Sequence, residues 1–204
     1  MVATSILRRA LTTSAQGASE HIAGTVSPHR CYLWLHSPTP ISSLPSNIQS
    51  PLLRRVLLKT RELGALVNFS WSPDQQVHPS SLDMANQDLA QVREVYRATA
   101  FSDNQSRLDI PELQLDNVDQ VYDALCSLQD DGSTRSLATG KVIKDEVKHL
   151  YVCTHGARDC RCGDTGGAIV QAIRAELERR RTGKDGDIWR NVRVREVAHI
   201  GGHK

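Results

Sequence analysis

Three of the five cysteines of this 204-residue chain lie within ten positions, in the segment Tyr151-Val-Cys-Thr-His-Gly-Ala-Arg-Asp-Cys-Arg-Cys-Gly163. A short apolar run precedes the thiols and a helical pattern follows them, so we predict a strand-to-helix loop that carries thiols. The last six residues, His199-Ile-Gly-Gly-His-Lys204, follow a second strand-like run at 192–198. Two thiols and two imidazoles at the ends of two strands predict a metal site with four ligands.

The spacing of the two outer cysteines bears on the kind of metal. Cys153 and Cys162 are nine positions apart, whereas cysteine pairs in structural zinc sites are separated by about two to four residues. A longer loop suits a larger group, and the Gly201-Gly202 pair lets the backbone approach that group without a side-chain clash. Arg158, Arg161 and a helix beginning just after Cys162 supply positive charge that favours thiolate and sulfide. We therefore predict an iron–sulfur cluster.

From the residues alone, other interpretations of these groups stay open. The two cysteines could be a buried or disulfide-linked pair, and the two histidines could belong to a solvated C-terminal tail. Cys160 could be a third ligand or a redox-active thiol. We interpret His155 as a residue near the site or on the surface, not as a ligand.

The two blocks together, Cys153 to Gly163 and His199 to Lys204, resemble the sucrase/ferredoxin-like family. A weaker likeness extends to Gly24-Thr-Val26 and to Val67-Asn-Phe-Ser-Trp71 in the first half. The family consists of thioredoxin-like ferredoxins, and the resemblance points to a mitochondrial member of the "altered inheritance of mitochondria" type. Family members continue past the second block, so we expect the ferredoxin domain here to be incomplete and the chain to be truncated at its C-terminus.

The resemblance also implies a ligand set. A [2Fe–2S] cluster would be bound by Cys153, Cys162, His199 and His203, and Cys160 would not be a ligand. We expect Arg158, Asp159 and Arg161 to brace the loop through hydrogen bonds, as groups behind metal ligands commonly do.

Strand-like and helical patterns alternate along the chain, which predicts an α/β fold. The predicted parts are a presequence or tail at 1–28, an N-terminal α/β layer domain at 29–130, a connector at 131–146, and an incomplete thioredoxin-like ferredoxin domain at 147–204. In the first domain we expect strands at 31–36 and 66–71 and helices at 51–63 and 118–128. We expect a further helix that begins at Ser80 or Ser81 and whose buried stripe ends at Tyr96. In the second domain we expect strands at 147–152 and 192–197 and a helix at about 165–181. Asp164 or Thr165 would cap this helix, and Ile169, Ile173 and Leu177 would line its inner face. Cys31 and Cys126 are expected to be buried thiols.

Composition excludes some classes of function. A net charge of +2 and an aromatic content of 4% give no basis for nucleic-acid binding, and no apolar run approaches the length of a membrane span. The first 28 residues are rich in Ser and contain Arg8 and Arg9 against a single acid, Glu20. This composition is typical of a mitochondrial presequence; the alternative is a disordered tail on a cytoplasmic protein.

These observations predict a mitochondrial electron carrier rather than an enzyme with its own substrate. It would exchange electrons with redox partner proteins that the sequence does not identify. One alternative is a thiol–disulfide redox protein that uses Cys160 and Cys162. Another is an interaction module stabilised by zinc. No carboxylate pair suits glycoside hydrolysis, and no nucleotide-binding loop is present.

Overall fold

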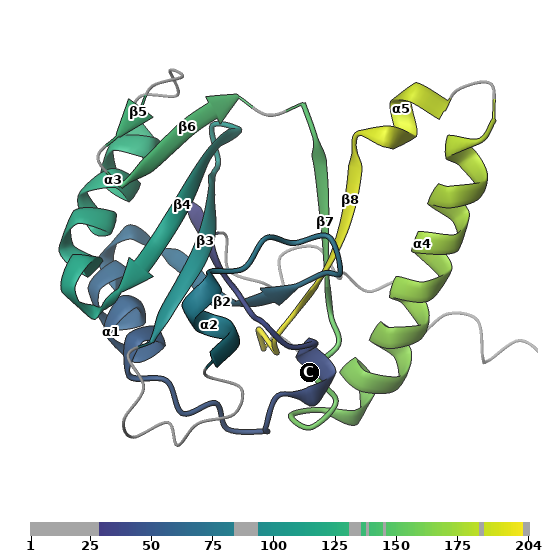
Figure 1. Ribbon diagram of the computed structural model, residues 1–204, viewed down its shortest axis with the longest axis horizontal. Helices are drawn as coiled ribbons and strands as arrows, with labels where there is room; N and C mark the ends of the chain where they lie inside the picture. Colours follow the sequence, from purple (N-terminus) through teal and green to yellow (C-terminus); the bar gives the residue numbers. More distant parts are fainter. Residues whose placement is uncertain are drawn as a thin grey trace, which may run out of the picture. The chain divides into compact units, whose positions relative to one another are not determined.

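The computed structural model describes residues 29–83, 94–130, 136–137, 139–144, 146–183 and 186–201. These residues contain one eight-stranded mixed sheet with helices packed against it (Figure 1). The strands are β1 (Cys31–His36), β2 (Ala65–Trp71), β3 (Val95–Ser102), β4 (Ser106–Gln114), β5 (Ser136–Leu137), β6 (Gly140–Lys144), β7 (Lys148–Cys153) and β8 (Val192–Val197). The helices are α1 (Pro51–Thr60), α2 (Pro79–Asp83), α3 (Val118–Asp130), α4 (Gly167–Arg181) and α5 (Gly186–Arg190). The predicted α/β class is confirmed.

The strand order is β5-β6-β4-β3-β1-β2-β8-β7. Two strand pairs are parallel, β1 with β2 across α1 and β7 with β8 across α4, and the other pairs are antiparallel. The predicted strand–helix–strand unit near the C-terminus is therefore present as β7, α4 and β8. Residues 29–201 group into one compact unit, in which the sheet runs through both the predicted N-terminal domain and the predicted ferredoxin-like domain.

The two halves of the sheet join over a short stretch. β8 pairs with β2 at Ser70 with Val197 and at Trp71 with Glu196. Beyond β8, the Ala198 amide donates to the Phe69 carbonyl oxygen at 3.0 Å. The C-terminal segment is thus held against β2 as it leaves the sheet.

Two hydrophobic cores lie on the helix-covered parts of the sheet. The larger core contains the predicted stripe of α3, Val118, Val121, Leu125 and Leu128, together with Leu52 and Val56 of α1 and apolar residues of β1 to β4 such as Leu33, Phe69, Ala98 and Leu108. The smaller core lies under α4 and contains Val170 and Leu177 packed on Val192 and Val194 of β8. Figure 1 shows α4 beside β7 and β8, and α1 and α3 beside the other strands. On α4, Ile173 packs against this core as predicted, but Ile169 is exposed and Val170 takes the inner position instead.

Helix α1 begins as its sequence predicts. Ser50 is the N-cap, its hydroxyl oxygen accepts from the Leu53 amide at 2.9 Å, and Pro51 occupies the first helical position. Pro at this position is favourable because its missing N–H would have no helical partner. The helix continues as a 3-10 turn, Arg61–Leu63, and ends at Gly64, whose φ of 62° is left-handed.

The prediction of a helix ending at Tyr96 is wrong. The structure describes the start of this segment as α2, which begins at Pro79, and residues 84–93 lie outside the described residues. Tyr96 is buried in strand β3 and not on a helix. The hairpin of β3 and β4 was not predicted. Among the cysteines of the first half, Cys31 is fully buried as expected and Cys126 is half-buried.

No helix in the described part of the chain combines the length and the apolar character needed to cross a bilayer.

Candidate metal centre

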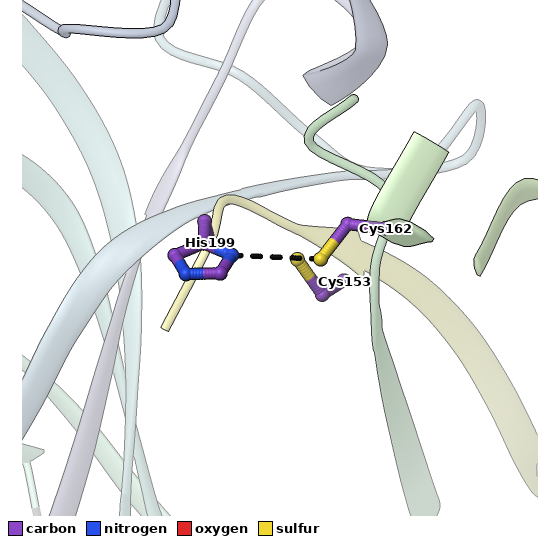
Figure 2. Close-up of side chains that lie close together, drawn as sticks. All are labelled: Cys153, Cys162 and His199. Carbon is purple, nitrogen blue, oxygen red and sulfur yellow. Dashed lines mark hydrogen bonds between the residues drawn. The ribbon is translucent and has the colours of Figure 1, made fainter. Parts of the chain in front are cut away.

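Three of the predicted ligands converge at one end of the sheet. Cys153 is the last residue of β7, Cys162 is the first residue of a π-helical turn, and His199 lies two residues after β8. Their sulfur and nitrogen atoms all lie within 4.8 Å of one another. The Cys162 Sγ is 3.5 Å from the His199 Nδ1 (Figure 2). The fourth predicted ligand, His203, lies outside the described residues.

The parallel pairing of β7 and β8 explains why these residues meet. Cys153 is in register with Val197, so the two strands end at the same edge of the sheet. In open α/β sheets this carboxyl edge is where ligands usually bind. The Thr154 amide donates to the Val197 carbonyl oxygen at 3.3 Å, which keeps the two chain segments together beyond the last strand pair.

The turn that carries Cys162 differs from the prediction. Asp164 and Thr165 were expected to cap α4, but both lie inside the π-helical turn Cys162–Gly166, which leads directly into α4. The Cys162 amide donates to the Asp159 carbonyl oxygen at 3.0 Å, so Cys162 lies within a helical turn and not before it. Single π-helical turns inside helices occur often at functional sites.

Two glycines allow this turn to approach the end of β7. A methyl group on Gly166 would overlap the carbonyl oxygen of Cys153. A methyl group on Gly163 would lie 2.7 Å from the Cα of Gly156 in the thiol loop. A side chain at either position would push the π-helical turn away from the backbone that it contacts. The close approach of Cys162 to Cys153 therefore requires glycine at both positions.

The residues predicted to brace the loop contribute unequally. The Asp159 carboxylate accepts from the Arg161 guanidinium at 2.7 and 3.1 Å and from the Arg161 amide at 3.0 Å. Arg158 contributes its backbone amide, which donates to the His155 carbonyl oxygen at 3.1 Å. Cys160 is exposed and, within the described residues, is not part of the donor group.

His155 holds the loop and the C-terminal segment together. Its side chain is buried, its Nε2 lies 3.0 Å from the Pro45 carbonyl oxygen, and its Nδ1 accepts from the His199 amide at 3.4 Å. Both contacts are satisfied when the ring proton is on Nε2. His155 thus fixes the backbone from which the His199 imidazole projects.

Replacing His155 is expected to cost considerable stability. His155→Ala removes a buried ring and two hydrogen bonds, so we expect the free energy of unfolding to fall by about 2–3 kcal/mol. Urea unfolding followed by tryptophan fluorescence measures the change. His78→Ala, at a half-buried histidine elsewhere on the molecule, is the control and should cost less than about 1 kcal/mol. Equal unfolding midpoints for the two variants would contradict this assignment.

A second contact anchors the same segment from β2. The Asn68 side-chain amide donates to the carbonyl oxygen of His199 at 3.0 Å, and its oxygen accepts from the Phe69 amide at 2.9 Å. On the other side, the buried carboxylate of Glu196 accepts from the Thr154 hydroxyl at 3.0 Å and pairs with Arg174 of α4 at 3.2 Å. The donor group is thus held by β2, α4 and the thiol loop together.

An apolar hollow of about 610 Å³ borders Cys153. Trp34 and Tyr151 stack there with ring centroids 4.8 Å apart, and Phe101 lies 4.8 Å from His149. Burial raises the pKa of Tyr151, and burial, with nearby arginines, lowers the pKa of His149 to about 4. This side of the donor group is therefore lined mainly by aromatic and aliphatic side chains.

In a comparison with models of known families, residues 22–204 match the family described as sucrase/ferredoxin-like. The chain belongs to the sucrase/ferredoxin-like family. No curated protein and no solved structure matches it. The family match runs through β1 to β8 and includes every residue of the donor group.

The sequence indicated the donors better than the groups that hold them. Asn68 lies in the Val67–Trp71 segment that resembles the sucrase/ferredoxin-like family. The resemblance therefore marks this segment, but it does not indicate what Asn68 does. We expect His155 from the sequence to lie near the site or on the protein surface; the structure places it near the site, with its ring buried.

Proposed function

We propose that this member of the sucrase/ferredoxin-like family is an electron carrier that binds a [2Fe–2S] cluster through Cys153, Cys162, His199 and His203. The observation that carries the proposal is the convergence of two sulfurs and one imidazole nitrogen from three separate segments, all within 4.8 Å. Thiolate and imidazole are the ligands of zinc and of iron–sulfur centres, whereas magnesium and calcium prefer oxygen. Membership of a family described as ferredoxin-like adds support.

The cysteine environment suits metal binding better than thiol exchange. Burial raises the pKa of the Cys162 thiol to about 12, and the hydrogen bond with Cys153 adds to this. At neutral pH this thiol is therefore protonated and a poor nucleophile in the absence of a cation. A bound metal would displace the proton and stabilise the thiolate. This argues against the alternative of a thiol–disulfide protein that reacts through Cys162.

The protein's own residues would orient the cluster and surround it on one side with apolar groups. His155 and Asn68 fix the His199 backbone, and aromatic residues line the hollow beside Cys153. When bound, the cluster supplies a one-electron redox couple whose potential is higher with imidazole ligands than with four thiolates. The function in this proposal is electron exchange with redox partner proteins.

One observation favours a second candidate, a structural zinc site. The three donor atoms lie within 4.8 Å, a separation that suits one tetrahedral ion with bonds of about 2.0–2.3 Å. Ligands of two different irons would be separated by the whole cluster core. Cluster binding therefore requires the His199 imidazole to turn away from Cys162 about its side-chain bonds, while His155 and Asn68 hold its backbone.

Metal analysis separates the two candidates. The full chain would be purified without oxygen, and iron, acid-labile sulfide and zinc would be measured beside the visible spectrum. The proposal predicts a red-brown protein with about two iron and about two sulfide per chain. A colourless protein with one zinc and no sulfide would contradict it and support the zinc site.

The proposal includes a mitochondrial location. Its support is the Ser-rich, acid-poor composition of residues 1–28, with Arg8 and Arg9 beside apolar residues. A fluorescent protein fused after residue 28 should enter mitochondria. A diffuse cytosolic signal would contradict the proposed mitochondrial location.

A further inference from the structure

A second hollow, of about 670 Å³, has none of the three metal donors on its wall. Its volume lies within the range of about 300–1,000 Å³ that is typical of small-molecule sites. Its wall carries five cationic side chains: Arg97, Arg107, Lys141, Arg193 and Arg195. We call it the arginine hollow. Its charge sets it apart from the apolar hollow beside Cys153.

The cations come from four strands. Successive side chains of a strand point to opposite faces, so residues two apart share a face. Arg193 and Arg195 of β8 follow this rule, as do Arg107 and Asp109 of β4. Arg97 lies at the register shift between Tyr96 and Ala98 of β3. Such bulges redirect side chains and occur often beside functional sites.

The carboxylates on the wall are already engaged. Asp109 pairs with Arg107 at 3.0 Å and lies opposite Lys141 in the β4–β6 ladder. The Asp74 carboxylate accepts from the Ser72 hydroxyl at 2.7 Å. Burial raises the pKa of Asp74, but the bond from Ser72 and the nearby arginines outweigh this, so the pKa is lowered overall. Two carboxylates against five cations leave an excess of three positive charges on the wall.

The uncharged polar groups of the wall are largely engaged with the chain itself. Burial lowers the pKa of His36 to about 4, with Arg195 and Arg97 contributing, so its imidazole is neutral at pH 7. Its Nδ1 contacts the Gln76 carbonyl oxygen at 2.7 Å, and its Nε2 lies 3.0 Å from the Thr99 hydroxyl oxygen. Gln75 is buried and donates to Ser70 through Nε2, while its side-chain oxygen has no hydrogen-bond partner among the described residues. The imidazole and the amide therefore leave the charge of the wall to its five cations and two carboxylates.

We propose that the arginine hollow binds a small molecule with two or more negative charges, carried by phosphate or carboxylate groups. Arg97 and Arg195, from β3 and β8, would hold the anion between the two halves of the sheet. Arginine suits this role because its planar group offers five N–H donors that match phosphate and carboxylate oxygens. Arg195 uses one of its nitrogens in a long contact, 3.4 Å, to the Ser72 hydroxyl.

Titration calorimetry on the full chain at low ionic strength tests the proposal, with pyrophosphate and citrate as probes. We expect saturable binding of at least one probe with one site per chain. Arg195→Gln and Arg97→Gln should each weaken it at least about tenfold, as expected for loss of a charge-assisted hydrogen bond. Arg190→Gln is the matched control, because Arg190 pairs with Asp187 on α5 and does not line the hollow. It should change the affinity less than about twofold.

The outcomes decide the proposal and the ligand class. Stronger binding of pyrophosphate would identify a phosphate compound, and stronger binding of citrate a polycarboxylate. Absence of saturable binding of both probes by the wild-type chain would overturn the proposal. An equal loss in Arg190→Gln would also overturn it, because the effect would then be one of overall charge. If Arg195→Gln fails to fold, Arg97→Gln and Lys141→Gln provide the same comparison.

Discussion

Cys153→Ser is expected to abolish the visible absorption of the iron-loaded protein, whereas Cys160→Ser should retain it. Cys153 contributes one of the three convergent donor atoms, while Cys160 is exposed and outside the donor group. A serine hydroxyl is a harder and less acidic ligand than a thiol, so it binds iron–sulfur centres more weakly than thiolate does at neutral pH. Absorption spectra and iron content of the two variants, purified side by side, measure the difference.

The two cysteines form a matched pair because they lie seven positions apart in the same loop. A general disturbance of the loop would affect both variants alike. If Cys153→Ser kept the full spectrum, its assignment as a ligand would be wrong. If Cys160→Ser lost the spectrum as well, Cys160 would have to be included in the ligand set.

Gly166→Ala is expected to reduce the free energy of unfolding by about 2–3 kcal/mol and to lower metal loading. The added methyl group would overlap the Cys153 carbonyl oxygen, so either the end of β7 or the π-helical turn must shift. Either shift separates Cys153 from Cys162. Chemical unfolding and metal content measured on the same preparation test both effects.

The neighbouring glycine provides the control for this prediction. A methyl group on Gly167 meets nothing within 4 Å, and Gly167 is the first residue of α4. Because alanine favours helix over glycine, Gly167→Ala should stabilise the protein by about 0.5–1 kcal/mol. If the two variants were equally stable, close backbone packing at Gly166 would not be required.

Much of the fold could be predicted from local patterns. The buried stripe of α3, from Val118 to Leu128, and the alternation of Val192 and Val194 in β8 follow from residue spacing alone. The Ser50-Pro51 start of α1 carries its own capping signal.

The β3–β4 hairpin could not be predicted in the same way. Val92 and Tyr96 are spaced as on a helix face, and β3 contains alanine and serine, which favour strands weakly. The turn between the strands contains Gln105 with a φ of 66°, where glycine or asparagine would be the usual signal. Pairing with β1 overrides these weak local preferences.

The metal-donor residues of the site could likewise be predicted from the sequence, whereas the contacts that hold them could not. The thiols and His199 are chemically distinctive, and the strand patterns that end at Cys153 and just before His199 place these two residues at one edge. The contacts of His155 depend on Pro45 and on His199, 110 and 44 positions away, and no local pattern predicts such contacts. The approach of Gly166 to Cys153 is likewise a tertiary feature.

Pulsed electron paramagnetic resonance of the reduced, iron-loaded full chain tests the central claim most directly, because it detects ligand nitrogen at the cluster. The account predicts strong coupling to histidine nitrogen, which changes when the histidines are labelled with ¹⁵N and is diminished in His199→Ala. A reduced cluster without strong nitrogen coupling, or a metal-loaded protein without any signal, would contradict it.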